Sequence, residues 1–198
     1  MIATGNPGKV RELSEMLNVL PFAFKGLTDV ANIAEVEETG DTFAENAGLK
    51  AAGYAIQARL WSLADDSGLE IAAMDGAPGV HSARYGGSDT PYSEKMRLLL
   101  EEMSVSGSLS RDARFVCAAA IADETGKIIF QAEGECRGTI AHRPRGTGGF
   151  GYDPLFIPDG HQLTFAELPD QVKAETSHRA RAISKIIRYL LGFTGTLT

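Results

Sequence analysis

Two adjacent aspartates, Asp65 and Asp66, are the sharpest chemical signal in this sequence. They follow the segment 61–64, which is predicted to be a β-strand, and they precede Ser67 and Gly68. Ligands of α/β proteins gather at strand ends, and two neighbouring carboxylates repel each other unless a cation lies beside them. Magnesium takes such hard oxygen ligands. The pair therefore predicts a magnesium site at a strand end.

A second group of carboxylates lies in the segment 35–41. Magnesium usually keeps several waters and needs only one or two carboxylates beside substrate phosphates. Taken alone, these residues are more simply explained as a solvated acidic loop, so the sequence leaves both interpretations open. The group comprises Glu35, Glu37, Glu38 and Asp41.

Phosphate binding is indicated by the segment Thr4-Gly5-Asn6-Pro7-Gly8-Lys9. Segment 1–4 is predicted to be a short strand, and Asn6 and Pro7 suit the cap and first position of a helix. Backbone N–H groups at a helix N-terminus attract anions, glycines let a phosphate approach, and Lys9 adds a charge. The spacing is not that of a Walker A loop. An ordinary strand-to-helix turn with a surface lysine explains the pattern equally well.

Two later segments offer groups that could surround a base. In the segment 148–154, Phe150 lies between glycines and has room to lay its face against a planar ring. Phe150 and Tyr152 could equally fill the core.

Lys173 and the segment Ser177-His178-Arg179 offer several hydrogen-bond donors near the start of the last predicted helix. By itself, a solvated first helical turn is the simpler interpretation of those residues.

The elements that must position these residues follow from hydrophobic periodicity. Apolar stripes at helical spacing predict helices after Asn6, after Thr42 to about residue 60, after Thr90, and over 170–191. Thr42 with Glu45 forms a capping box for the second of these helices. Strands and helices alternate early and a hairpin follows, which predicts an α/β fold with a mixed sheet. The predicted strands are 1–4, 22–27, 61–64, 113–123 and 128–137.

Composition excludes several classes of protein. With 198 residues and no linker, the chain is predicted to be one domain, residues 1–198. A net charge of -7 without a basic cluster argues against a nucleic acid polymer as partner. No apolar run approaches the ~20 residues of a membrane span. Cys117 and Cys136 lack metal-site spacing, so we expect buried free thiols and a cytoplasmic location.

The motifs in their order closely resemble the inosine/xanthosine triphosphate pyrophosphatase family, essentially from the first residues to the last helix. They are ATGNPGK at 3–9, VEETGDTFAENAGLKA at 36–51, LADDSGLE at 63–70, GAPGVHSARYGG at 76–87, GTGGFGYDPLF at 146–156 and SHRARA at 177–182. The resemblance implies a mixed twisted central sheet flanked by helices, with two lobes and an active-site cleft between them. It also implies a homodimer.

The resemblance further implies an activity and a set of site residues. The activity is Mg²⁺-dependent hydrolysis of ITP, dITP and XTP to the monophosphate and pyrophosphate, which keeps deaminated purines out of DNA and RNA. Asp66 would be the proton acceptor and, with Glu37, a metal ligand; only motif alignment favours Glu37 over Glu38. The residues implied to bind substrate are Thr4, Gly5, Asn6, Pro7, Gly8, Lys9, Ser67, Phe150, Gly151, Tyr152, Asp153, Lys173, His178 and Arg179.

Base choice would follow from hydrogen-bond polarity. Hypoxanthine and xanthine carry an oxygen at position six, where adenine carries an amino group. Arg179 has donors and no acceptor, which makes it the candidate reader of that oxygen. The competing hypotheses are a nucleotide phosphotransferase, a non-catalytic nucleotide-binding module and a pyrophosphatase for modified pyrimidine nucleotides.

Overall fold

The computed structural model describes residues 1–194 and has an α/β fold, as predicted. Its strands are β1 (Ser62–Ile71), β2 (Asp112–Ala122), β3 (Ile128–Ile140) and β4 (Phe156–Pro158). Its α-helices are α1 (Pro7–Leu17), α2 (Phe43–Ala58), α3 (Tyr92–Val105), α4 (Asp170–Thr176) and α5 (His178–Thr194). Short 3-10 helices cover η1 (Leu27–Asp29), η2 (Ala72–Met74) and η3 (Gly79–His81).

The strands form one four-stranded sheet in the order β1-β2-β3-β4, and within the described residues the parallel pairing expected of a mixed sheet occurs only as an isolated bridge outside these strands. β3 and β4 run antiparallel, with Ile140 opposite Phe156, whereas Ile2 forms a parallel bridge with Leu63. The chain divides into two compact units. Unit 1 comprises residues 1–66, 117–134 and the chain from 178 onward, and unit 2 comprises residues 67–116 and 135–177.

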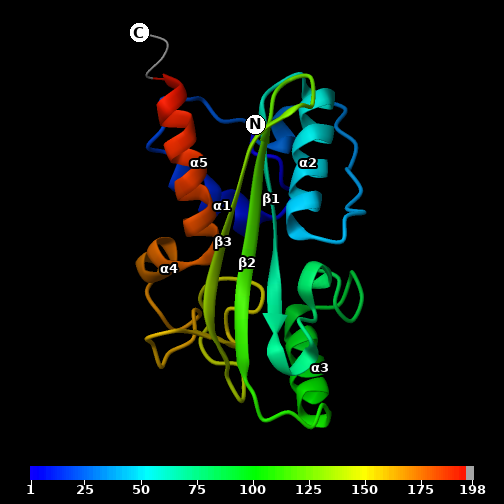
Figure 1. Ribbon diagram of the computed structural model, residues 1–198, viewed down its shortest axis with the longest axis vertical. Coiled ribbons are helices and arrows are strands. Elements are labelled where there is room, and N and C mark those ends of the chain that lie inside the picture. The colour runs from blue at the N-terminus through cyan, green and yellow to red at the C-terminus, as the bar shows by residue number, and fades with distance from the viewer. Residues whose placement is uncertain (195–198) are drawn as a thin grey trace. The chain divides into compact units, whose positions relative to one another are not determined.

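In unit 1, helices cover both faces of the strands, as Figure 1 shows for α5 and α2. α1 packs on α5, and the two helices share a buried core with the β1 and β2 residues Leu63 and Cys117. On β3, the ring of Phe130 stacks on that of Tyr189 of α5, with centroids 4.3 Å apart. The next residue, Gln131, donates to the carbonyl oxygen of Ala44 of α2 at 3.2 Å. Successive strand residues face opposite sides, so α2 and α5 lie on opposite faces.

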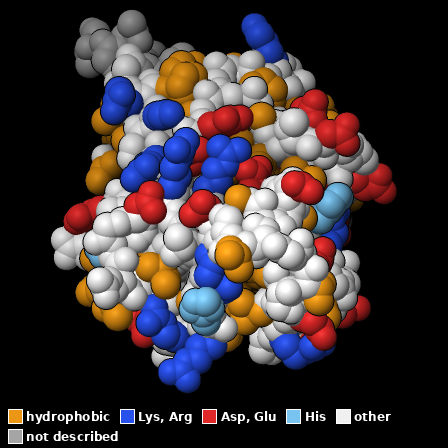
Figure 2. Space-filling view, turned by 60° about the horizontal axis from the view of Figure 1, so that its bottom comes forward, with side chains coloured by type: hydrophobic (Ala, Val, Ile, Leu, Met, Phe, Trp, Pro, Cys, Tyr) orange, Lys and Arg blue, Asp and Glu red, His pale blue; other side chains and the backbone are white. Residues whose placement is uncertain are grey.

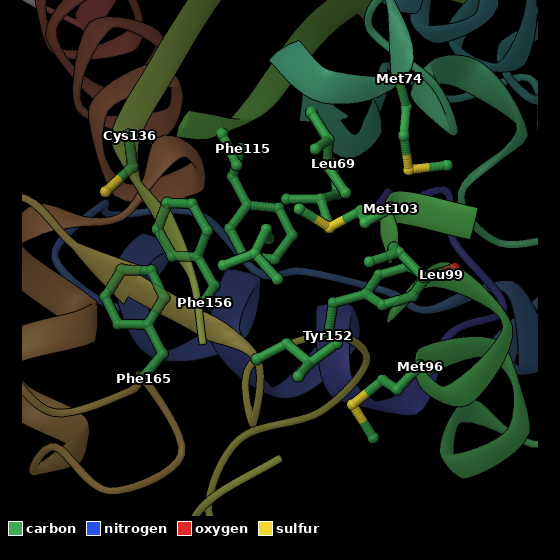
Figure 3. Close-up of a cluster of buried hydrophobic side chains, with 14 residues drawn as sticks. Leu69, Met74, Met96, Leu99, Met103, Phe115, Cys136, Tyr152, Phe156 and Phe165 are labelled. Atoms are coloured by element: carbon green, nitrogen blue, oxygen red, sulfur yellow. The ribbon is translucent and has the colours of Figure 1, made fainter. Parts of the chain in front are cut away.

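Unit 2 has a separate core that contains three phenylalanine rings (Figure 3). The rings of Phe115, Phe156 and Phe165 pack together, and the Phe115 and Phe156 centroids are 4.6 Å apart. α3 contributes Met96, Leu99 and Met103 to the same cluster, which matches its predicted inward face. Tyr152, from the glycine-rich segment 148–154, is also buried in this core. The nucleotide loop predicted from the sequence is therefore anchored in the core of unit 2.

β1 and the two strands predicted before it, 1–4 and 22–27, differ from the sequence predictions. β1 was expected to end before the two aspartates, but it continues through them to Ile71. Residues 1–4 contribute only the bridge of Ile2. The segment 22–27 forms no strand in the described part of the chain, because its one backbone contact to Ile2 is followed by the turn of η1.

The last helix is interrupted at Ser177, where the sequence predicted one continuous helix over 170–191. Ser177 has φ -66° and ψ 160°, an extended conformation that ends α4 before α5 begins at His178. A serine hydroxyl competes for backbone hydrogen bonds, which makes such a break inexpensive. The break assigns Lys173 to unit 2 and Arg179 to unit 1.

Both cysteines are free and buried, as predicted. Within residues 1–194, every helix falls short of the length and apolar character needed to cross a bilayer.

Gly134 of β3 permits the close approach of α5, and its replacement should test this packing. A methyl group there would meet the carbonyl oxygen of His178 and the backbone nitrogen of Ala182. Gly134→Ala should therefore lower the free energy of unfolding by about 1–3 kcal/mol, measured by urea denaturation. Gly192→Ala is the control, because an added methyl there meets nothing within 4 Å. Equal stability of the two variants would contradict the proposed packing.

Candidate functional site

Asp65 and Asp66 are consecutive residues of β1, so their side chains point to opposite faces of the strand. Asp65 shares the face of Leu63, beneath α1 and α5, whereas Asp66 turns toward Lys50 of α2. The two carboxylates therefore do not converge on one point. The pleat separates them, and lysine or arginine cations lie beside each of them.

Asp65 is the centre of a buried ionic cluster in unit 1. Its Oδ2 atom lies 3.1 Å from Lys9 Nζ and accepts hydrogen bonds of 3.2 Å from both Nε and Nη2 of Arg179. Arg179 Nη1 donates to Glu12 of α1 at 2.6 Å, and the Cys117 thiol lies 3.8 Å from the same Asp65 oxygen. Two positive and two negative groups meet here, so the cluster is neutral.

The opposite charges in the cluster also determine the protonation states of Asp65 and Arg179. Burial alone would raise the pKa of Asp65, but the charges of Lys9, Arg179 and Lys50 outweigh it and hold the pKa well below its usual value. Burial likewise opposes the charge of Arg179, yet Asp65 and Glu12 keep its pKa above the ordinary value. Asp65 is thus ionised throughout the neutral range and joins α1 to α5 through charge.

Asp66 lies in a second cluster that is not neutral. Lys50 Nζ is 3.0 Å from Asp66 Oδ1 and 2.8 Å from Glu38 Oε1. One positive and two negative groups leave this cluster with a net charge of -1. Burial raises the pKa of Asp66, and Lys50 opposes that shift only in part. In the described residues, no donor bonds to the buried Asp66 Oδ2 atom.

The acidic loop that carries Glu38 is tied to the start of α2. The side chain of Asn46 accepts from Gly40 N at 2.8 Å and donates to Gly40 O at 3.2 Å. Thr42 and Glu45 form the predicted capping box. These bonds direct Glu38 toward Lys50 and Asp66, whereas the side chain of Glu37 is exposed. The structure thus brings Glu38, and not the predicted Glu37, next to Asp66.

Asp66 and Glu38 have the chemistry of a hard-cation site. Within the described residues, no three His, Cys, Asp or Glu side chains converge as a complete metal cage. Magnesium requires less, because substrate phosphates and waters complete its coordination. The buried Asp66 oxygen that accepts no hydrogen bond in the described residues, and the excess negative charge beside it, fit such an ion.

The predicted phosphate segment forms the expected capped helix start, with one difference. Asn6 Oδ1 accepts from the backbone nitrogens of Gly8 and Lys9 at 2.9 and 3.1 Å. These two N–H groups therefore satisfy the helix cap and are not the open anion donors that were predicted. What remains for an anion is the positive end of α1, the charge of Lys9 and open space at Gly5, where an added Cβ meets nothing within 4 Å.

In unit 2, the glycine-rich segment forms a compact nest around Asp153. Asp153 Oδ2 accepts from Phe150 N at 2.7 Å and from Lys173 Nζ at 2.5 Å. Lys173 Nζ also lies 4.4 Å from the centre of the Phe150 ring. Gly149 has φ 68°, and a side chain there would collide with Asp153. An aromatic face and a paired ammonium are thus held together by one buried carboxylate.

The predicted site residues fall into two groups. Unit 1 contains Thr4 to Lys9, Glu37, Asp66, His178 and Arg179, and unit 2 contains Ser67, Phe150 to Asp153 and Lys173. Arg179 is only 1% exposed and holds two carboxylates, which corrects its expected position as an open reader of a base.

Sequence reasoning missed Lys50 and Glu12, and it gave Asp65 no role of its own. One signal could have identified Lys50. It occupies the alanine-rich face of α2, between Ala47 and Ala51, and a lysine on a buried helical face requires acceptors for its ammonium. Glu12 carries no comparable signal, because its partner Arg179 is 167 residues away in the sequence.

The charges on the molecular surface are mixed. On the face shown in Figure 2, Lys and Arg side chains gather beside Asp and Glu side chains instead of forming one broad basic surface. A mixed face of this kind suits a small charged ligand better than a long phosphate backbone.

Comparison with known proteins reveals close relatives along nearly the whole chain. A family model described as the Ham1 family matches residues 1–189. A dITP/XTP pyrophosphatase of a Nostoc species is 47% identical over 187 residues, which cover 94% of this chain and 91% of that protein. The same name is borne by an Exiguobacterium protein that is 46% identical, with 98% and 97% covered. A solved structure of a HAM1 protein from Coxiella burnetii is similar, with a TM-score of 0.89, 39% identity and coverage of 96% and 97%.

Asp65→Asn should destabilise the protein, because it leaves Lys9 and Arg179 buried with too little negative charge. We expect a loss of about 3–5 kcal/mol in the free energy of unfolding at pH 7, measured by urea denaturation. The folded pKa of Asp65 lies below its unfolded value of about 3.9, so its stabilisation is fully present above about pH 5 and is lost only in stronger acid. The difference between variant and wild type should accordingly narrow below about pH 4.

The matched control is Asp159→Asn, the same change at an exposed position. A variant at position 65 that is as stable as this control would show that the buried cluster does not stabilise the fold.

Proposed function

Because this chain belongs to the Ham1 family, we propose that it is a magnesium-dependent pyrophosphohydrolase for deaminated purine nucleotides. The substrates would be ITP, dITP and XTP, and the products the nucleoside monophosphate and pyrophosphate. The observation that carries this proposal is the Asp66 cluster: a buried carboxylate with one oxygen that accepts no hydrogen bond in the described residues, one adjacent lysine and a net negative charge. The named activity of the relatives supports the choice of substrate.

The triphosphate would bind at the start of α1. Gly5 leaves room for a phosphate, and the helix dipole and Lys9 supply positive potential. In the structure Lys9 Nζ is shared with Asp65, whose charge is also balanced by Arg179. Lys9 can therefore turn toward a phosphate without leaving Asp65 unpaired, which makes this lysine the natural phosphate ligand.

Asp66 and Glu38 would hold the magnesium ion. When bound, the ion would neutralise negative charge on the phosphate oxygens and orient them. Lys50 now lies between the two carboxylates at 3.0 and 2.8 Å. It keeps them close together in the free protein, where two unbalanced carboxylates would repel each other.

Asp66 is also positioned to accept a proton. Its buried Oδ2 can take the proton of a water whose oxygen attacks a phosphorus of the α–β anhydride, while the bond to the bridging oxygen breaks and pyrophosphate leaves. A pKa raised by burial makes Asp66 a stronger base than an exposed aspartate. Lys50 on the other oxygen fixes the orientation of the carboxylate.

Base recognition would fall to Phe150 and Lys173 in unit 2, with Asp153 as their holder. The Phe150 ring offers a stacking face, and the Lys173 ammonium is a donor without acceptor character. Such a donor suits the oxygen at position six of hypoxanthine or xanthine and opposes the amino group of adenine. One unpaired buried group costs about 1–3 kcal/mol, or roughly ten- to hundredfold in rate.

The homodimer remains a prediction from the family resemblance.

The proposed activity is tested by pyrophosphate release from ITP, XTP, GTP, ATP and dUTP, each with magnesium and with EDTA. We expect magnesium-dependent release from ITP and XTP, little from the other three, and none with EDTA. Asp66→Asn should lower kcat by about 10²- to 10⁴-fold. No release from either oxopurine by the folded protein would refute the proposed function, and faster release from dUTP would assign it to pyrimidines.

The choice of Glu38 as metal ligand gives a paired prediction. Glu38→Gln should raise the magnesium concentration needed for half-maximal ITP hydrolysis by at least about tenfold, because a carboxylate ligand becomes neutral. Glu37→Gln, the same change one residue earlier on an exposed side chain, should leave that concentration within about twofold of the wild-type value. The reverse pattern would return Glu37 to the role predicted from the sequence.

A further inference from the structure

Lys95 of α3 is a buried lysine whose ammonium binds only backbone carbonyls. It is 1% exposed, and its Nζ atom donates to Ala83 O at 2.8 Å, Tyr85 O at 3.0 Å and Gly87 O at 2.7 Å. An ammonium has three hydrogens, so all of its donors are used. The segment 83–87 is thus wrapped around one positive charge.

Three carbonyl oxygens that converge on one point repel each other without a cation, because each carries the negative end of a peptide dipole. Among the other bonds of the segment, the Tyr85 hydroxyl bonds the Glu102 carboxylate of α3, whereas Gly87 N to Arg84 O and Thr90 Oγ1 to Gly86 O are local. Lys95 therefore ties the backbone carbonyls of the segment 83–87 to α3, and the Tyr85 side chain, which packs against the core of unit 2, is a second tie.

The segment 82–87 in turn supports the glycine-rich nucleotide loop. The Tyr152 hydroxyl donates to Ser82 O at 3.0 Å, one residue before the first carbonyl that Lys95 holds. Ser82 is itself fixed, because its hydroxyl accepts from Leu69 N at 2.9 Å and donates to Gly79 O at 2.6 Å. In Figure 3, Tyr152 lies in the core cluster near Leu99 and Met96.

Tyr92, one helical turn before Lys95, places the start of α3 against the glycine-rich loop. Its ring meets the Tyr152 ring edge-on, with centroids 5.2 Å apart, and Lys95 Nζ lies 5.8 Å from its centre. A Cβ at Gly151 would be 3.6 Å from the same ring. The first turn of α3 therefore contacts both the segment 82–87 and the loop that presents Phe150 and Asp153.

We propose that Lys95 is a positioning residue for nucleotide binding: it fixes the segment 82–87, which through Ser82 O and Tyr152 sets the geometry of residues 149–153. Lys95 does not touch the substrate. The inference rests on the proposed function for the identity of the ligand, but the coupling between the two loops belongs to the fold itself.

The experiment compares Lys95→Met, which keeps the length and loses the charge, with Lys95→Gln, which keeps two donors. Lys95→Met should raise the KM for ITP by about tenfold, the effect of losing one charge-assisted contact, with kcat within about threefold of wild type. The KM of Lys95→Gln should lie between those of Lys95→Met and the wild type. Inhibition by pyrophosphate, which probes the phosphate segment of unit 1, should not change. Lys185→Met is the control, since Lys185 is exposed and bonds a single carbonyl, that of Glu133.

Hydrogen exchange of the backbone amides supplies a readout that does not depend on activity. In Lys95→Met, exchange should accelerate in residues 82–87 and in 149–153, and not in α1 or α2. Faster exchange confined to 82–87, or an unchanged KM in the folded variant, would overturn the proposal. So would a loss of pyrophosphate inhibition parallel to the rise in KM, because that would indicate general destabilisation. If Lys95→Met does not fold, the same measurements of KM, pyrophosphate inhibition and hydrogen exchange on Lys95→Gln test the proposal.

Discussion

The alternation of side chains along β1 is the constraint on which the charged centre of this protein depends. Because successive residues of a strand face opposite sides, Asp65 and Asp66 enter two different environments although they are neighbours in the chain. On one face, Lys9 and Arg179 neutralise Asp65. On the other, Lys50 only partly neutralises Asp66 and Glu38. One pair of identical residues thereby yields a neutralised structural anchor on one face and a carboxylate in a cluster of excess negative charge on the other.

The helices of unit 1 supply different charged groups to these two environments. α1 and α5 pack against each other and supply Glu12 and Arg179, so their charges close into a neutral, buried cluster. α2 brings a single lysine to Asp66, and the capping box and Asn46 hold the acidic loop beside it. A buried ion pair contributes little net stability, but breaking one is costly. The Asp65 cluster thus secures the geometry, while the unbalanced charge of the Asp66 cluster can be used for binding.

In unit 2, buried charged groups likewise hold loop segments in place. A buried carboxylate, Asp153, orients Phe150 and Lys173, and a buried ammonium, Lys95, gathers the carbonyls of a neighbouring segment. Tyr152 joins the two through one hydrogen bond and through its place in the apolar core. A glycine is required at position 149, where Asp153 approaches the backbone, and Gly151 has a positive φ of 68°. The irregular loop is therefore ordered by groups in the core, not by regular secondary structure.

The sequence by itself determined the local features of this protein. Asn6 and Pro7, the Thr42–Glu45 box and the apolar run of β2 act over a few residues, and each appears in the structure as predicted. The order of motifs also determined the family. Only the tertiary structure decided which face each aspartate of β1 occupies, that Glu38 approaches Asp66, and that Arg179 is buried against Glu12 and Asp65. These facts depend on how far β1 extends and on contacts between separate elements, from Lys50 and Glu38, 12 residues apart, to Arg179 and Glu12, 167 residues apart. No short-range pattern encodes the charge balance that such partners create.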